Sequence, residues 1–193
     1  MNSFFQTFSE TKVPELLRLK KNFCNYMDSI NPSEFGVAVS GGGDSIALLY
    51  LTHFWAHQKD RNFRVATVDH CLRPDSNAEA IFVKNLVKSL GENHETLVWD
   101  SWDKKGNLQA KASEARYSLL SDWAKQHSLK SIILGHSLND QAETILMRLL
   151  RGSGVDGLCG IYPEKISNNI YWIRPLIKFS REELRNFLKY FCI

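Results

Sequence analysis

Residues 36–49 read GVAVSGGGDSIALL. The first four are small or β-branched and predict the end of a buried strand, and Ile46 to Leu49 begin an apolar helical pattern. Three consecutive glycines lie between them, so backbone N–H groups can converge on an anion at the N-terminus of the helix. This order predicts a phosphate site at the carboxyl edge of a parallel sheet.

The rest of the 193-residue chain repeats the same alternation of apolar strand and helical pattern. The expected strands are 35–39, 63–68, 94–98, 131–134 and 170–173. The expected helices between them are 44–57, 75–90, 107–127 and 139–151. We therefore expect an α/β fold with an open, mostly parallel, doubly wound sheet flanked by helices.

Composition restricts the class of protein. The chain is 44% hydrophobic and 23% charged, which excludes a disordered, collagen-like or coiled-coil protein. A net charge of +3 is too small to argue for nucleic-acid binding by itself. The four cysteines are widely spaced, so we expect reduced thiols in the core rather than a disulfide framework or a metal site.

Chain organisation predicts one domain over 1–193, with a last helix over about 180–193 that ends on apolar residues. The chain therefore looks cut short, with further C-terminal domains expected to be absent from it. The N-terminus has the wrong charge order for a signal peptide, and no run approaches the roughly 20 apolar residues of a membrane span. We expect a cytoplasmic protein without a membrane partner.

The glycine loop lacks both the Gly-Lys-Ser/Thr ending of the usual ATPase loop and the dinucleotide fingerprint. Asp44 would repel a triphosphate unless it holds Mg²⁺ or lies at one remove from the phosphates. The alternative is that Asp44 or Ser45 caps the helix.

Three further segments carry candidate polar residues, of which only the one after the second strand is expected at the same edge of the sheet. His70 and Arg73 follow the second strand, in either a nucleoside pocket or an ordinary loop. Arg116 lies in mid-helix, where its donors suit a phosphate or it is simply a surface residue. Arg151 follows a helix and can approach RNA phosphate or serve as a C-terminal cation.

His136 ends the fourth strand, and Asp140 and Glu143 share one face of the next helix. All three side chains can face the phosphate site. The alternative is local, because Ser137 and Asp140 nearly form a capping box. Two other features are set aside: the His53/His57 pair lacks a third metal ligand, and the tryptophans are expected in the core.

The motifs resemble a known superfamily and then one of its families. SGGGDS at 40–45 resembles the signature of the PP-loop (N-type) ATP pyrophosphatases, which cleave ATP between the α- and β-phosphates and adenylate a carbonyl oxygen. The order and spacing of the later motifs resemble the tRNA(Ile)-lysidine synthetase family. These motifs are VDHCLRPDS at 68–76, EARY at 114–117, LGHSLNDQAET at 134–144, LLRGSG at 149–154 and RPL at 174–176.

This resemblance implies a Rossmann-like catalytic domain of the adenine nucleotide alpha hydrolase type. It implies ATP binding by Ser40, Gly41, Gly42, Gly43, Asp44, Ser45, Asp69 and His70. It implies catalytic roles for Asp44, Arg116, His136 and Asp140, with Asp44 and Asp140 as Mg²⁺ ligands. Contacts with RNA or substrate are implied for Arg73, Glu143 and Arg151.

The implied reaction is a carbon–nitrogen ligation on the wobble cytidine of isoleucine tRNA with a CAU anticodon. The cytosine is adenylated by ATP, free L-lysine displaces AMP, and codon reading changes from AUG to AUA. A homodimer is compatible with the sequence. The alternatives are another PP-loop enzyme, such as a tRNA thiolase or an amide-forming synthetase, and a catalytically silent module that binds ATP or RNA.

Overall fold

The computed structural model describes residues 2–71, 76–100, 106–152 and 159–193. Its helices are α1 (Asn2–Glu10), α2 (Pro14–Ile30), α3 (Gly43–Gln58), α4 (Ser76–Ser89), α5 (Leu108–Gln126), α6 (Leu138–Leu150) and α7 (Arg181–Tyr190). Its strands are β1 (Phe35–Ala38), β2 (Arg64–Asp69), β3 (Asn93–Val98), β4 (Ser131–Leu134), β5 (Glu164–Ser167) and β6 (Ile170–Ile173).

In the described residues the strands form a six-stranded sheet in the order β3-β2-β1-β4-β6-β5. The pairs from β3 to β6 are parallel, and β5 joins the edge as an antiparallel neighbour of β6. The expected open, mostly parallel sheet is confirmed. The antiparallel edge strand and helices α1 and α2 were not among the expected elements.

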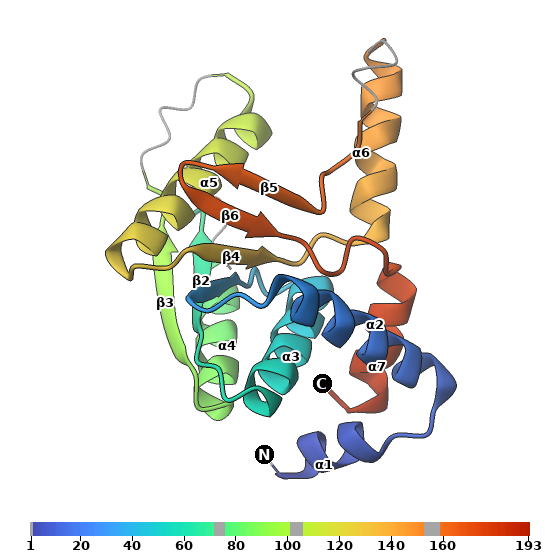
Figure 1. Cartoon of the computed structure of the whole chain (residues 1–193). Coiled ribbons are helices and arrows are strands. Elements are labelled where there is room, and N and C mark those ends of the chain that lie inside the picture. Colours follow the sequence, from blue (N-terminus) through green and yellow to red (C-terminus); the bar gives the residue numbers. More distant parts are fainter. Residues whose placement is uncertain (1, 72–75, 101–105, 153–158) are drawn as a thin grey trace.

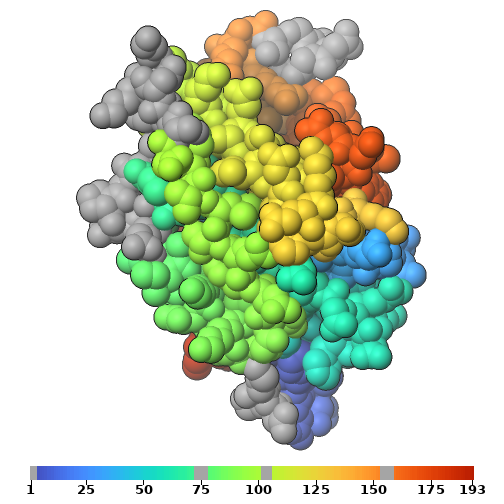
Figure 2. Space-filling model, turned by 90° about the vertical axis from the view of Figure 1, so that its left-hand side faces the viewer, coloured from blue at the N-terminus to red at the C-terminus, as the bar shows by residue number. Residues whose placement is uncertain are grey.

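Alternate residues of β1 enter two different cores, as the period of a strand requires. Phe35 and Val37 pack with the apolar residues of α2, α3, α4 and α7, while Ala38 packs with those of α5. Figure 1 shows these two layers, with α5 on one face of the sheet and α3, α4 and α7 on the other. Figure 2 looks onto the β3 side, where residues of α4, β3 and α5 form most of the surface.

The strand order reverses between β1 and β4, because the chain runs from β1 to β2 and β3 and then returns to the other side of β1. Ligands of open α/β sheets bind at such a switch point, outside the carboxyl ends of the strands. The loops after β1 and β4 therefore define where a site is expected.

The cysteines depart from expectation. Cys71, Cys159 and Cys192 are exposed, so their expected placement in the core is wrong, whereas Cys24 is partly buried and packs against the core. All four are free thiols, as expected. Helix α6 has no buried residue and projects beyond the sheet (Figure 1). None of the helices in the described ranges is long and apolar enough to cross a membrane.

Candidate active site

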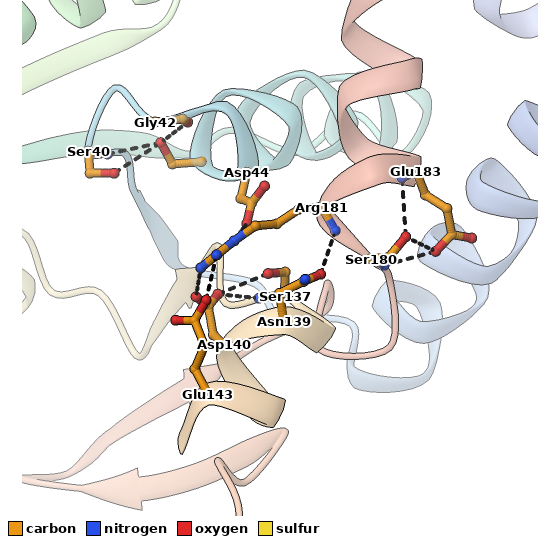
Figure 3. Close-up of polar contacts among 11 residues, drawn as sticks. Ser40, Gly42, Asp44, Ser137, Asn139, Asp140, Glu143, Ser180, Arg181 and Glu183 are labelled. Atoms are coloured by element: carbon orange, nitrogen blue, oxygen red, sulfur yellow. Dashed lines mark hydrogen bonds and ion pairs between the residues drawn. The ribbon is translucent and has the colours of Figure 1, made fainter. Parts of the chain in front are cut away.

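The loop after β1 is shaped by one strained backbone position and one hydroxyl. Gly41 has φ +92°, a conformation that L side chains rarely adopt. The hydroxyl of Ser45 donates to Gly42 O at 2.7 Å and accepts from Ser40 N at 3.2 Å (Figure 3). Because Ser45 is buried, these bonds fix the loop against the first turn of α3.

Neither Asp44 nor Ser45 caps α3, so that alternative is wrong. The N-cap is Gly42, and no side-chain hydrogen bond closes this end of the helix. The orphan N–H groups of the first turn and the helix dipole are thus available to an anion.

A cavity of about 480 Å³ opens in front of this loop. Its wall combines the β1 loop with residues from α5, the end of β4, α6 and α7. The residues that line it are Ala38, Ser40, Gly42, Gly43, Asp44, Ser45, Arg116, Gly135, His136, Asp140, Arg181 and Arg185. The predicted residues Asp44, Arg116, His136 and Asp140 are therefore brought together around one space.

Arg116 connects this space to two neighbouring cavities. One, of about 330 Å³, is lined by Asp69 and His70 at the end of β2, and the other, of about 310 Å³, is lined by Gln109 and Tyr117. Arg116 lines all three. Arg116 is partly buried and faces these cavities rather than the open surface, which disfavours the alternative of a solvated surface arginine. Burial lowers the pKa of its guanidinium.

His136 is held neutral. Burial, together with the charges of Arg174 and Arg116, lowers its pKa to about 4 against the opposing effect of Asp140. Its buried Nδ1 has no hydrogen-bond partner within the described part of the chain. A neutral imidazole with a free ring nitrogen can bond a ligand without adding charge.

One hydrogen bond and one aromatic contact hold the residues at the end of β2. Asp69 is buried, and its Oδ1 accepts from Cys71 N at 2.9 Å. His70 packs edge-on against Trp99, with ring centroids 5.6 Å apart, and burial followed by the charge of Arg116 lowers its pKa. Arg73 lies outside the described residues.

Asp140 uses its two oxygens for different contacts. Oδ2 accepts from Ser137 N at 2.7 Å, which is one half of the capping box of α6, and also from Ser137 Oγ at 3.0 Å. Oδ1 accepts from Arg181 Nη2 at 2.5 Å. Burial opposes ionisation, but the bonds from Ser137 and Arg181 lower the pKa of Asp140 below its usual value. Asp140 therefore both caps α6 and lines the cavity.

The remaining predicted residues lie differently. Glu143 is exposed and its Oε1 meets Arg181 Nη1 at 2.6 Å (Figure 3). Arg151 is exposed at the C-terminal end of α6, about 20 Å from the end that faces the cavity. The structure therefore keeps Arg151 apart from the other candidates.

Sequence reasoning missed Arg181. A signal existed, because Ser180 and Glu183 form a capping box in which Arg181 is the first helical residue. A cation in the first turn is unfavourable to the helix dipole, so an arginine there indicates a partner elsewhere.

Metal ligands were predicted at Asp44 and Asp140. Within the residues the structure describes, no group of three or more His, Cys, Asp or Glu side chains is arranged to hold a metal ion. Asp44 and Asp140 nevertheless face the same cavity, and Mg²⁺ commonly takes only one or two carboxylates together with substrate phosphates. The donor chemistry fits that ion.

A PP-loop domain matches residues 15–192. The chain is 46% identical over 158 residues to a tRNA(Ile)-lysidine synthase of Ruegeria pomeroyi, covering 82% of this chain and 38% of that protein. It is 43% identical over 177 residues to a tRNA(Ile)-lysidine synthase of Wolbachia pipientis, covering 91% of this chain and 41% of that protein. The chain thus spans about two fifths of the length of these curated relatives.

Solved structures share the fold at low identity. A U34-tRNA thiolase from Methanococcus maripaludis with a 4Fe–4S cluster superposes with a TM-score of 0.77 at 16% identity, covering 91% of this chain and 63% of that one. An NMN synthetase from Francisella tularensis has a TM-score of 0.60 at 14% identity, covering 92% and 69%. At such identities the likeness shows the fold alone.

Proposed function

The chain belongs to the PP-loop domain family, and we propose that it is the ATP-using catalytic domain of a tRNA(Ile)-lysidine synthase. Support comes from relatives of that name at 46% and 43% identity and from the cavities around Arg116. The observation that carries the proposal is that Arg116 lines all three cavities, where a phosphate, a nucleoside and an attacking base can meet.

The proposed arrangement places the nucleoside and the triphosphate of ATP in two neighbouring cavities. The nucleoside lies in the cavity beside Asp69 and His70. The triphosphate lies against the glycine loop, where backbone N–H groups and the dipole of α3 attract it. The α-phosphate then lies near Arg116, whose guanidinium stabilises charge that develops on it.

The cavity with Gln109, Tyr117 and His136 takes the wobble cytidine. The 2-carbonyl oxygen of the cytosine attacks the α-phosphate, the bond to the β-phosphate breaks, and pyrophosphate leaves. The neutral ε-amine of free lysine then attacks C2 of the base, the bond to the AMP oxygen breaks, and AMP leaves with the product lysidine. The amine loses a proton in this step, and a carboxylate or imidazole near the base accepts it.

Asp44 and Asp140 would hold Mg²⁺ with phosphate oxygens. When bound, the ion supplies charge neutralisation to the departing pyrophosphate. Little acid–base chemistry is needed before lysine arrives, so the first step depends chiefly on positioning and electrostatics.

The proposal extends to the partners and the location. The substrates are isoleucine tRNA with a CAU anticodon and free L-lysine, and the place of action is the cytoplasm, where tRNA is modified before translation. A homodimer is part of the proposal, since exposed apolar side chains of α6 such as Leu146, Leu149 and Leu150 could pack between two copies. Sedimentation velocity tests that part.

The decisive assay measures pyrophosphate and AMP released from ATP and Mg²⁺ with unmodified isoleucine tRNA, with and without lysine, followed by mass analysis of the digested tRNA. We expect tRNA-dependent pyrophosphate release and a lysine-bearing cytidine only when lysine is present. Turnover that requires a sulfur donor or ammonia instead of lysine contradicts the proposal. So does ATP binding with no pyrophosphate release from a chain extended to the length of its relatives.

A further inference from the structure

Arg181 is surrounded by three carboxylates from two other helices. Its Nη2 lies 2.5 Å from Asp140 Oδ1, its Nη1 lies 2.6 Å from Glu143 Oε1, and its Nε lies 3.4 Å from Asp44 Oδ2 (Figure 3). Asp44 belongs to α3 and the other two carboxylates belong to α6. One guanidinium therefore connects the phosphate loop with the opposite wall of the cavity.

Hydrogen bonds fix the position of the Arg181 backbone. Arg181 N donates to Asn139 Oδ1 at 2.9 Å, and Leu138 N donates to Phe179 O at 2.8 Å. The N-termini of α6 and α7 are thus held together, and the capping box of Ser180 and Glu183 fixes the first turn of α7. The Arg181 side chain is 37% exposed and lines the cavity, so it borders open space there.

Within the cluster around Arg181 the carboxylates outnumber the guanidinium, although Arg116 and Arg185 also line the cavity. Asp44, Asp140 and Glu143 carry three negative charges against the single positive charge of Arg181. A triphosphate entering the same cavity brings further negative charge, which the carboxylates repel. A divalent cation that binds the carboxylates removes this repulsion and releases the guanidinium, whose planar donors suit phosphate oxygens.

We propose that Arg181 is an exchangeable internal cation. Without nucleotide it neutralises Asp44, Asp140 and Glu143, and when metal and ATP bind it turns to the phosphate oxygens in the same cavity. Arg181 is thus a positioning residue that couples metal binding to nucleotide binding. This inference rests on the proposed use of ATP and adds to it a residue that the sequence did not reveal.

The exchange predicts effects of opposite sign for Arg181→Gln. The affinity for metal alone should rise by about tenfold, the size of a typical coupling between ligands. The reason is that the carboxylates lose the internal cation that competes with the metal. An ATP analogue with Mg²⁺ should bind about tenfold more weakly, because the phosphate loses a bidentate donor. A purely structural role would weaken both kinds of binding.

The test titrates Mn²⁺ without nucleotide by the EPR signal of the free ion, and titrates α,β-methylene ATP with Mg²⁺ by calorimetry. The matched control is Arg18→Gln, which removes a different ion pair to α7, that between Arg18 and Glu183, away from the cavity. We expect Arg18→Gln to behave as wild type in both titrations and Arg181→Lys to restore Mn²⁺ affinity to near the wild-type value.

The proposed exchange is overturned if Arg181→Gln weakens the binding of both Mn²⁺ and the ATP analogue. It is also overturned if Arg181→Gln changes neither affinity. Neither titration contains tRNA or lysine, so the two proposals can fail separately. If the two affinities shift in opposite directions but no lysidine forms in the activity assay, the proposed substrate is contradicted and the exchange is not. A wild-type chain that binds no analogue contradicts both proposals.

Discussion

Gly135 at the end of β4 lies directly against Ser45 at the start of α3. A Cβ at position 135 would lie 3.1 Å from Ser45 Cα and 3.4 Å from Asp44 O, and both of these atoms are backbone. The phosphate loop is therefore positioned by the bare backbone of a neighbouring strand as well as by its own hydrogen bonds.

Gly135→Ala should displace the phosphate loop by a few tenths of an ångström. Overpacking of this kind costs about 1–3 kcal/mol of unfolding free energy. We expect the binding of α,β-methylene ATP to weaken by more than the loss of unfolding free energy explains. Calorimetry measures the binding, and urea denaturation measures the stability. Unchanged binding would mean that the loop does not rest on β4.

Arg116→Ala should slow pyrophosphate release by roughly 10² or more, as for removal of one donor to a developing oxyanion. Single-turnover kinetics with saturating ATP and tRNA isolate this step. The matched control on the same helix is Lys111→Ala, which removes only the exposed pair with Glu114. An equal loss of rate in both variants would contradict a role at the α-phosphate.

Asp44→Asn should abolish the Mg²⁺-dependent turnover while the fold stays nearly intact, because Asp44 caps nothing and its ion pair is with Arg181. A Mg²⁺ titration of pyrophosphate release, with circular dichroism as the check on folding, measures this. Asp122→Asn, which changes an exposed pair with Lys125, is the control. Wild-type Mg²⁺ dependence in the Asp44 variant would remove Asp44 from the metal site.

His136 should remain neutral well below the ordinary pKa of histidine. Its pKa of about 4 lies below the usual 6.5, so the unfolded chain binds more protons between these values. The stability contributed by neutral His136 is full above about pH 6.5 and is lost as the pH falls toward 4. An NMR titration of the imidazole, with unfolding of wild type and His136→Gln from pH 7 to 4, measures this, and titration near 6.5 would contradict the burial argument.

The sheet was predictable because its strands are short apolar runs separated by helical patterns. Both Ser131–Leu134 and Ile170–Ile173 were predicted with the observed bounds. Strand β5 was not, since Glu164–Ser167 is polar and largely exposed and becomes a strand only by pairing with β6. Helix α2 was not predicted either, although Leu16, Leu19, Phe23 and Met27 have helical spacing and are buried.

The site was predictable to the extent that its residues follow strands. The ends of β1, β2 and β4 meet at one edge, so Asp44, His70 and His136 could be placed near one another before any geometry was known. Arg181 could not be placed in this way, because its partners lie on α3 and α6, far away in the sequence. Its position depends on how α7 packs, which local patterns do not encode.

The pairing of β1 with β4 also constrains the order of folding. Phe35 aligns with Ser131, which lies about half the chain away, so a long loop must close before β1 pairs with β4. Contacts of such long range form slowly. During refolding, helical signal should therefore return before nucleotide affinity, and the ability to bind ATP is a late acquisition of the folding chain.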